Sequence, residues 1–193
     1  MSRLSNLKSV RNGKAWLVWL LLAVILSRFV ARSVFLIGDV PSESMQDTMM
    51  VGDKFFCINK YFLDDIKNGD IVVFYPNEKE QSLAEGYWVK RVIGVPGDKI
   101  NIVNGVISVN GVEQEEEYVH HQASYTCSFT VPAGKYFLCG DNRSGSWDAR
   151  DWENPFIPKE QIKYKALFRL IPISKFGNIY KEHSIPIGEK SNE

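Results

Sequence analysis

The sequence predicts a mainly β protein, in which one transmembrane helix precedes a membrane-anchored antiparallel β-sheet domain. The helix is indicated by residues 15–37, where 19 of 23 residues are apolar. The sheet is indicated by short runs of alternating apolar and polar residues that begin near residue 50 and are separated by glycine-containing turns. The full length of 193 residues fits one domain of ordinary size beyond the helix, which we expect to occupy residues 38–174.

The formal net charge of zero hides an uneven distribution along the chain. Residues 1–40 hold six basic residues and one acid (+5), whereas residues 41–193 hold 17 basic and 22 acidic residues (−5). A domain without a basic excess gives no reason to expect a nucleic-acid partner. The hydrophobic share of 45% excludes general disorder, and three cysteines are too few for a disulfide scaffold.

The apolar residues 15–37 match the length of about 20 residues that a helix needs to cross a bilayer. Residues 1–14 precede them with basic side chains and no acid. By the positive-inside rule, we expect 1–14 to be a basic cytoplasmic segment, 15–37 a single-pass anchor in the lipid bilayer, and the rest extracytoplasmic. Arg28 and Arg32 lie one helical turn apart, so both can extend toward the far head groups.

Two other interpretations of this segment stay open. A cleaved signal peptide has the same basic start, and Ala31-Arg32-Ser33 has the small-x-small form of a cleavage site. A buried core helix is the other. The arginines near the site and the apolar residues beyond it favour a retained anchor over a cleaved signal.

Alternating apolar residues predict the strands of the domain. The predicted strands are Lys54–Asn59, Ile71–Tyr75, Tyr87–Ile93, Lys99–Val103, Val106–Val109, Lys135–Cys139 and Ile162–Ile171. The pairs Asn104-Gly105 and Asn110-Gly111 are typical of two-residue hairpin turns, so we expect a small β insert over residues 100–134. Residues 60–68 are expected to form a short helix and residues 175–193 a loose polar tail.

The cysteines and histidines do not indicate a metal or a cofactor. Cys57 and Cys139 lie in apolar strand patterns and are predicted to be buried free thiols, while Cys127 lies in a polar stretch from which it could pair with either. His120 and His121 are adjacent, and adjacent residues of a strand face opposite ways. They would make a poor chelating pair, so no metal site and no cofactor are expected.

Three segments carry more polar chemistry than a plain β architecture needs. The first runs from Pro41 to Met49 and contains Ser42-Glu43-Ser44-Met45; it follows the apolar stretch, and taken alone it is an ordinary polar linker. The second runs from residue 87 to residue 98, and strand alternation places Lys90 on one face with Trp88 and Val92. If that face is buried, desolvation lowers the pKa of the lysine, as a lysine general base requires; an exposed lysine on an edge strand is the alternative.

The third segment runs from Gly140 to Arg150, directly after an apolar strand. Its small polar and charged residues fit either a solvated loop or a network that holds a site in shape. In this order, the three segments resemble the serine-methionine, lysine and Gly-Asp-Asn-Arg boxes of the bacterial type I signal peptidases. The spacing agrees, with 46 residues from Ser44 to Lys90 and 51 from there to Asp141. The resemblance covers residues from about 10 to 172, and the short chain with one anchor resembles the Gram-positive form.

The resemblance implies a membrane-bound serine endopeptidase with a Ser-Lys dyad. Ser44 would be the nucleophile and Lys90 the general base that takes its proton. The backbone N–H of Ser44 and the hydroxyl of Ser42 would stabilise the oxyanion. The substrates would be the signal peptides of exported preproteins, cleaved after small residues at positions −3 and −1.

The same resemblance assigns supporting roles to five further residues. Ser146 matches the serine that helps to orient the lysine, and Met45 would pack beside the nucleophile. Asp141, Asp148 and Arg150 match positions that support the site structurally.

One residue departs from the family pattern. Proline usually stands two residues after the methionine, whereas this chain has Asp47 there. Proline would rigidify the turn after the nucleophile, so Asp47 is expected to alter that loop or substrate entry. Two alternative functions stay open: a specialised Ser-Lys processing peptidase for one client, and a catalytically silent anchored β domain that binds exported chains, of which Asp47 is the main support.

Overall fold

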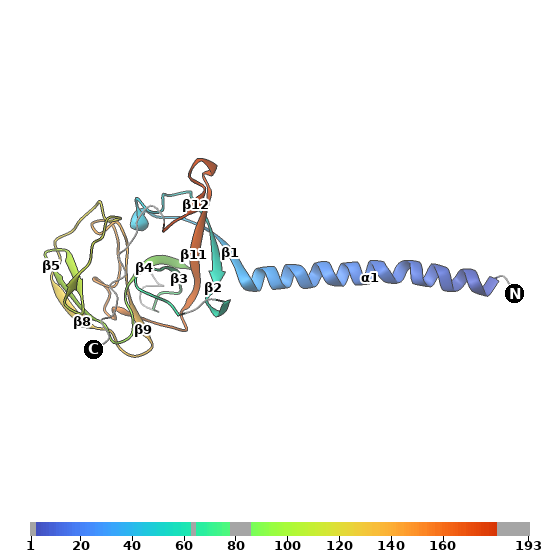
Figure 1. The fold of residues 1–193 in the computed structure, drawn as a ribbon, viewed down its shortest axis with the longest axis horizontal. Coiled ribbons are helices and arrows are strands. Elements are labelled where there is room, and N and C mark those ends of the chain that lie inside the picture. The colour runs from blue at the N-terminus through green and yellow to red at the C-terminus, as the bar shows by residue number, and fades with distance from the viewer. Residues whose placement is uncertain (1–2, 63–64, 78–85, 181–193) are drawn as a thin grey trace. The chain divides into compact units, whose positions relative to one another are not determined.

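The computed structural model describes residues 3–62, 65–77 and 86–180, and it divides the chain into two units that meet between Phe35 and Leu36. The first unit contains helix α1 (Arg3–Val34), and the second contains the strands (Figure 1). Within α1, every side chain from Ala15 to Val30 is exposed. In the described part of the chain, no helix has both the length and the apolar character that crossing a membrane takes.

The helix ends three residues before the predicted boundary at Ile37. Phe35–Asp39 form strand β1, in which exposed and half-buried residues alternate. β1 lies next to β2 in the main sheet, so pairing between strands provides the backbone partners that a continued helix would have provided. The prediction of helix through Ile37 is therefore wrong at its end.

The main sheet has the strand order β1-β2-β11-β3-β4-β9-β10, with β12 also paired to β11. The pairings from β2 to β10 are antiparallel, as predicted. The bounds beyond β1 are β2 Lys54–Asn59, β3 Ile71–Phe74, β4 Trp88–Gly94, β9 Lys135–Cys139, β10 Phe156–Pro158, β11 Ile162–Ile171 and β12 Gly177–Asn178. Because β4 lies between β3 and β9, it is an interior strand.

A second, smaller sheet has the order β7-β6-β5-β8. Its strands are β5 Lys99–Val103, β6 Val106–Val109, β7 Val112–Glu113 and β8 Cys127–Thr130. Both predicted Asn-Gly turns are present, since Asn104 and Asn110 have φ of 50° and 54° and each following glycine also has positive φ.

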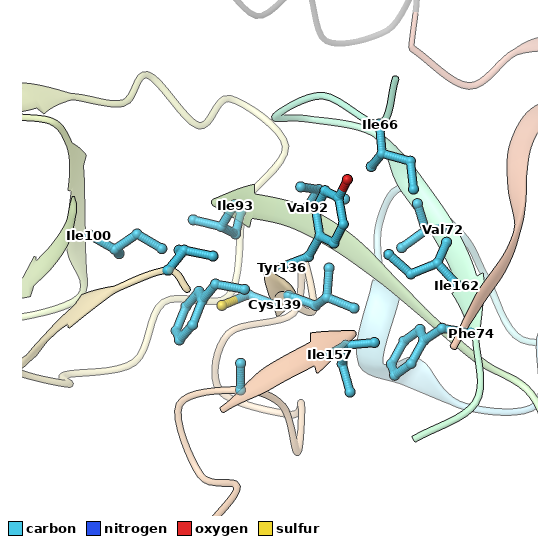
Figure 2. Close-up of a cluster of buried hydrophobic side chains, with 14 of the residues drawn as sticks. Ile66, Val72, Phe74, Val92, Ile93, Ile100, Tyr136, Cys139, Ile157 and Ile162 are labelled. Atoms are coloured by element: carbon cyan, nitrogen blue, oxygen red, sulfur yellow. The ribbon is translucent and has the colours of Figure 1, made fainter. Parts of the chain in front are cut away.

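Strand β3, in the interior of the main sheet, is buried on both faces. In β3, Val72 and Phe74 join one hydrophobic cluster, whereas Ile71 and Val73 join another. Figure 2 shows the first cluster, in which Ile100 of the second sheet meets side chains of the main sheet. The second cluster includes Met45 and Met49, and it therefore holds the segment around Ser44 against the sheet.

The strand predictions are confirmed for all seven runs, with identical bounds for β2, β5, β6, β9 and β11. β3 ends one residue earlier than predicted, and β4 is shifted by one residue. The predicted helix over 60–68 is reduced to one 3₁₀ turn, Lys60–Phe62, with residues 63–64 outside the described part. All three cysteines are free, and Cys57 and Cys139 are buried as predicted.

The prediction of a loose tail is wrong for residues 175–180. A 3₁₀ turn at Ile173–Lys175 leads into β12, and Ile179 is buried. The hydroxyl of Tyr180 accepts from the backbone N–H of Ile71 (2.9 Å) and donates to the carbonyl of Ala166 (2.8 Å). These contacts bind the segment to the sheet; the predicted tail from 181 to 193 lies outside the described residues.

Candidate active site

Ser44 lies in a 3₁₀ turn, Glu43–Met45, that follows β1. The turn is anchored to the core, because the side chains of Met45 and Met49 are both buried there. The backbone N–H of Met49 donates to the carbonyl of Met45 at 2.8 Å. Burial of the neighbouring methionine leaves the Ser44 side chain directed away from the core, half-buried and open to a reaction partner.

Lys90 lies on β4 and is only 4% exposed. Its Nζ donates to Oγ of Ser44 at 2.6 Å. It also lies 5.9 Å from the ring centroid of Trp88, its predicted neighbour on the same face. The buried-face interpretation is therefore confirmed, and the alternative of an exposed lysine on an edge strand is wrong.

Burial lowers the pKa of Lys90 to about 8, because a charged ammonium is disfavoured away from water. The charges of Asp148, Cys139 and Asp141 act in the opposite direction, and Arg150 adds to the lowering. Burial is the largest of these effects. At pH 7 about one molecule in ten therefore carries the neutral amine, a far larger share than for a lysine of ordinary pKa.

Ser42 lies two residues before the turn and is exposed. Its hydroxyl is 3.4 Å from Oγ of Ser44, to which it donates a long hydrogen bond. The predicted neighbours Ser42, Ser44 and Lys90 thus form one continuous polar group.

The loop from Gly140 to Arg150, called the site loop below, follows β9. Within it, the guanidinium of Arg150 donates two hydrogen bonds to the carboxylate of Asp148, both at 2.8 Å. The backbone N–H of Gly140 donates to the same carboxylate at 2.9 Å. Burial by itself would raise the pKa of Asp148, but the bonds from Arg150 and Gly140 outweigh it and keep the pKa low. A buried charged pair thus ties the two ends of the site loop together.

Asp141 is fully buried and binds Arg91, the residue after the lysine on β4. Two hydrogen bonds join them, Nε to Oδ1 at 2.8 Å and Nη2 to Oδ2 at 2.7 Å. Arg91 also donates to the carbonyl of Gly69 at 2.9 Å. Burial opposes the charge on the guanidinium, but Asp141 outweighs it and raises the pKa of Arg91. The sequence analysis missed Arg91, although strand alternation places it opposite the face of Lys90.

The site loop touches the serine turn directly. Asn142 donates from its backbone N–H to the carbonyl of Ser44 and from Nδ2 to the carbonyl of Glu43, both at 3.2 Å. A Cβ atom on Gly140 would lie 2.3 Å from the carbonyl oxygen of Ser44 and 2.2 Å from Oγ of Ser146. Position 140 therefore requires glycine because the turn and the loop pack against its Cα. Neither Asn142 nor Gly140 was predicted to contact the serine turn.

Ser146 is buried in the site loop, and its hydroxyl helps to keep the pKa of Asp148 low. The hydroxyl makes no hydrogen bond of ordinary geometry within the described residues. The structure therefore brings Ser146 to the site without a bond to Lys90.

A cavity of about 470 Å³ opens beside Ser44 and Lys90. The residues that line it come from the segment 40–49 around Ser44, from residues 87–90 at the start of β4, and from the site loop: Val40, Pro41, Ser42, Ser44, Met45, Met49, Tyr87, Trp88, Val89, Lys90, Gly145 and Trp147. Met45 and Ser44 thus line the same cavity. Trp147, which the sequence analysis did not single out, lines the cavity with half of its surface exposed.

Asp47 is exposed, and its Oδ2 lies 3.5 Å from Nε2 of His121 in the segment between β7 and β8. Its carboxylate thus pairs with an imidazole of the insert.

Within the described residues, no group of three or more His, Cys, Asp or Glu side chains is arranged to hold a metal ion.

Comparison with known proteins connects this geometry to a family. Residues 13–171 match the family described as signal peptidase, peptidase S26. The probable signal peptidase I-1 of Synechocystis sp. is 36% identical over 171 residues, covering 84% of this chain and 83% of the relative. Signal peptidase IB of Staphylococcus aureus is 32% identical over 181 residues, covering 83% of this chain and 91% of the relative.

Among solved structures, signal peptidase I from Enterococcus faecalis V583 is 27% identical and aligns with a TM-score of 0.41, covering 52% of this chain and 95% of that one. From the family match and the curated relatives, the chain belongs to the signal peptidase family, peptidase S26, and within it to the type I enzymes. The resemblance found in the three sequence boxes is thereby confirmed.

Proposed function

We propose that the chain is a membrane-bound serine endopeptidase with a Ser44–Lys90 dyad that removes signal peptides from exported preproteins. The observation that carries the proposal is the 2.6 Å contact between Nζ of Lys90 and Oγ of Ser44 at the wall of the cavity. The names of the relatives, which are signal peptidases I, support the choice of substrate.

The chemistry begins with the neutral amine of Lys90. As Oγ of Ser44 attacks the carbonyl carbon of the scissile bond, its proton moves to Nζ of Lys90. The oxyanion that forms is stabilised by the hydroxyl of Ser42 and the backbone N–H of Ser44. The C–N bond then breaks, and the ammonium of Lys90 returns the proton to the leaving amine, which becomes the N-terminus of the released protein.

The second half of the reaction removes the acyl group from Ser44. Lys90, neutral again, takes a proton from a water molecule, whose oxygen attacks the ester carbonyl. The ester C–O bond breaks, and Oγ of Ser44 recovers its proton from the lysine. The signal peptide leaves with a free carboxylate.

The cavity walls support cleavage after small residues at positions −3 and −1. Val40, Met45 and Val89 are apolar residues close to the dyad. Apolar walls this near to the nucleophile favour a small apolar side chain next to the scissile bond. A polar side chain would lack hydrogen-bond partners there, and a long one would clash with the walls.

We also propose that the apolar part of α1, from residue 15 to residue 34, is the membrane anchor, with the basic residues 1–14 in the cytoplasm and the β domain outside. The support is the exposure of large apolar side chains along it, such as Trp19 (71%) and Phe29 (69%). An apolar surface of this extent is unfavourable in water, and the lipid bilayer is the partner that fits its chemistry. Holding enzyme and preprotein on one membrane raises their effective concentration.

Cleavage of a preprotein by the purified chain tests the dyad. Ser44→Ala and Lys90→Ala should each abolish product formation, whereas Ser108→Ala and Lys99→Ala, on the second sheet, should cleave like the wild type. Wild-type activity in either dyad variant would refute the mechanism. Several unrelated preproteins belong in the assay, because cleavage of one alone would identify a specialised processing peptidase.

The anchor is tested separately, in cell membranes. The mature N-terminus should begin near Met1, and the protein should stay with the membrane after alkaline carbonate extraction. A mature N-terminus after Ser33 would establish a cleaved signal peptide instead.

A further inference from the structure

The segment from residue 114 to residue 126, called the insert arm below, joins β7 to β8 without any helix or strand. It contains three successive glutamates, of which only the middle one is directed inward. Glu115 and Glu117 are exposed, whereas the side chain of Glu116 is only 8% exposed. Since a buried carboxylate is stable only when it is paired, the partner of Glu116 identifies what the arm holds.

That partner is Arg143 of the site loop. Nη1 and Nη2 of Arg143 donate to the two carboxylate oxygens of Glu116 at 2.9 and 2.7 Å, and the arginine side chain is 2% exposed. Nε of Arg143 also donates to the carbonyl of Gly140 at 3.0 Å, while Arg150 donates to the carbonyl of Arg143 at 2.9 Å. Through one arginine, the arm is therefore connected to both ends of the site loop.

Tyr118 gives the arm a second contact with the site. Its hydroxyl donates to Oε1 of Glu116 at 2.7 Å, and its ring centroid lies 3.8 Å from Cζ of Arg91. Arg91 is the residue that binds Asp141. The buried ring thus covers the charged pair that joins β4 to the site loop and keeps water from it.

The site loop in turn sets the surroundings of the dyad. Asn142 is bonded to the carbonyl of Ser44. The charged and titratable groups that face Lys90 are Asp141, Asp148 and Arg150 of the site loop and Cys139 of β9, with Ser44 in direct contact. If the site loop is displaced, its charged groups move with it, and water reaches the amine of Lys90.

Given the proposed function, on which this inference rests, we infer that Glu116 and Tyr118 are positioning residues for the reaction. They hold the site loop against Ser44 and Lys90 from a segment that contributes no residue to the cavity lining. Through these two residues, the insert positions the site loop for the reaction.

The test compares Glu116→Gln with Glu115→Gln and Glu117→Gln. All three variants remove one negative charge from adjacent positions, and only the first breaks a buried pair. We expect Glu116→Gln to lower kcat by about 10- to 100-fold with little change in KM, because small displacements of a site have effects of that size. The acidic limb of its pH–rate profile should move to higher pH, since water that reaches Lys90 removes the main cause of its lowered pKa. The two control variants should match the wild type.

Tyr118 provides a graded second series, which keeps the test decisive if Glu116→Gln folds poorly. Tyr118→Phe loses one hydrogen bond and keeps the ring over Arg91, so its kcat should fall less than that of Tyr118→Leu. Wild-type kcat and an unmoved acidic limb in both Glu116→Gln and Tyr118→Leu would overturn the inference. A loss of folded protein with an unmoved limb would also overturn it, because that result indicates a structural role alone.

Amide hydrogen exchange separates this inference from the proposed function. Residues 140–150 should exchange faster in Glu116→Gln than in Glu115→Gln, whether or not any preprotein is cleaved. Equal exchange in the two variants would contradict the inference and leave the proposed function intact. Preprotein cleavage by Ser44→Ala would instead refute the proposed function, even where exchange shows that Glu116 holds the site loop.

Discussion

The Nζ atom of Lys90 lies 2.6 Å from Oγ of Ser44, although 46 residues separate the two in sequence. The next residue on the same strand, Arg91, binds Asp141 with two hydrogen bonds. Successive residues of a strand point to opposite faces, so one step along β4 separates the candidate base from a buried structural cation.

The pH–rate profile should report the lowered pKa of Lys90. Because the reaction needs the neutral amine, kcat/KM should rise with pH and level off above a pKa of about 8. A free lysine has its pKa near 10.4, so an acidic limb in that range would contradict the assignment. Lys90→Arg should be inactive at every pH tested, since a guanidinium keeps its proton.

Lys90→Met should make the protein more stable at neutral pH. The folded-state pKa of Lys90 is about 8, below its unfolded value of 10.5, so the unfolded chain binds more protons between these values. The free energy of unfolding of the wild type should therefore increase relative to that of the variant as pH rises from 8 to 10.5. Below pH 8, the lowered pKa of Lys90 reduces the stability of the folded wild type by an amount of the order of 3 kcal/mol, at 1.36 kcal/mol per pKa unit. Urea unfolding of both proteins at pH 7 and pH 10.5 measures the change, and an equal difference at both pH values would contradict it.

Asp141→Asn should destabilise the fold strongly. The substitution leaves the Arg91 guanidinium, which is 2% exposed, without its carboxylate, and breaking a buried pair in this way costs about 3–5 kcal/mol. Asp39→Asn is the matched control, because it removes a carboxylate from an exposed pair with Lys54, where side chains are 68% and 44% exposed. The control should change the free energy of unfolding by less than about 1 kcal/mol. Equal effects in thermal or urea unfolding would show that burial of the pair has no energetic role.

Gly140→Ala should impair activity strongly, although it adds only one methyl group. The added methyl group would collide with the carbonyl oxygen of Ser44 and with Oγ of Ser146, so the turn and the loop must separate. A displacement near 1 Å at a reacting group costs about 100-fold in rate. Gly38→Ala is the control, since its Cβ would meet nothing within 4 Å. Preprotein cleavage by both variants at matched folded fraction provides the measurement, and equal rates would refute the packing argument.

The strands were predictable because their signals are local. Alternation of apolar residues placed β2, β5, β6, β9 and β11 at their observed bounds. The Asn-Gly pairs predicted the hairpin turns because positive φ at both positions is a property of the residues themselves.

The helix end and the C-terminal segment were predicted wrongly because tertiary contacts decide them. Phe35 to Ile37 are apolar enough to extend a helix, yet they pair in a sheet instead. Residues 175–180 read as polar, and only the folded sheet offers Ile179 a buried site and the Tyr180 hydroxyl two backbone partners.

The candidate site was predictable where chemistry is carried by short motifs. Ser44 and Lys90 were named from their boxes, and the structure brings them into contact. The pair of Glu116 and Arg143 had no comparable signal, because three glutamates in a row do not indicate which of them is buried. Such a pair becomes visible only when the insert and the site loop lie in contact.

The pairing of β4 with β3 has a consequence for how this sequence can change. Lys90 lies opposite Val72 and Arg91 lies opposite Ile71. A single codon inserted or deleted between the two strands, if absorbed by sliding β4 one position, would move every side chain of β4 to the opposite face. A slide in one direction would put Arg91 in the place of Lys90, so that a permanent cation faces the serine. A slide in the other direction would put Lys90 in the place of Arg91, beside Asp141. Changes of length between Phe74 and Trp88 are therefore tolerated only where the pairing of β4 with β3 keeps its register, so reading-frame-preserving indels should divide sharply into neutral and inactivating ones.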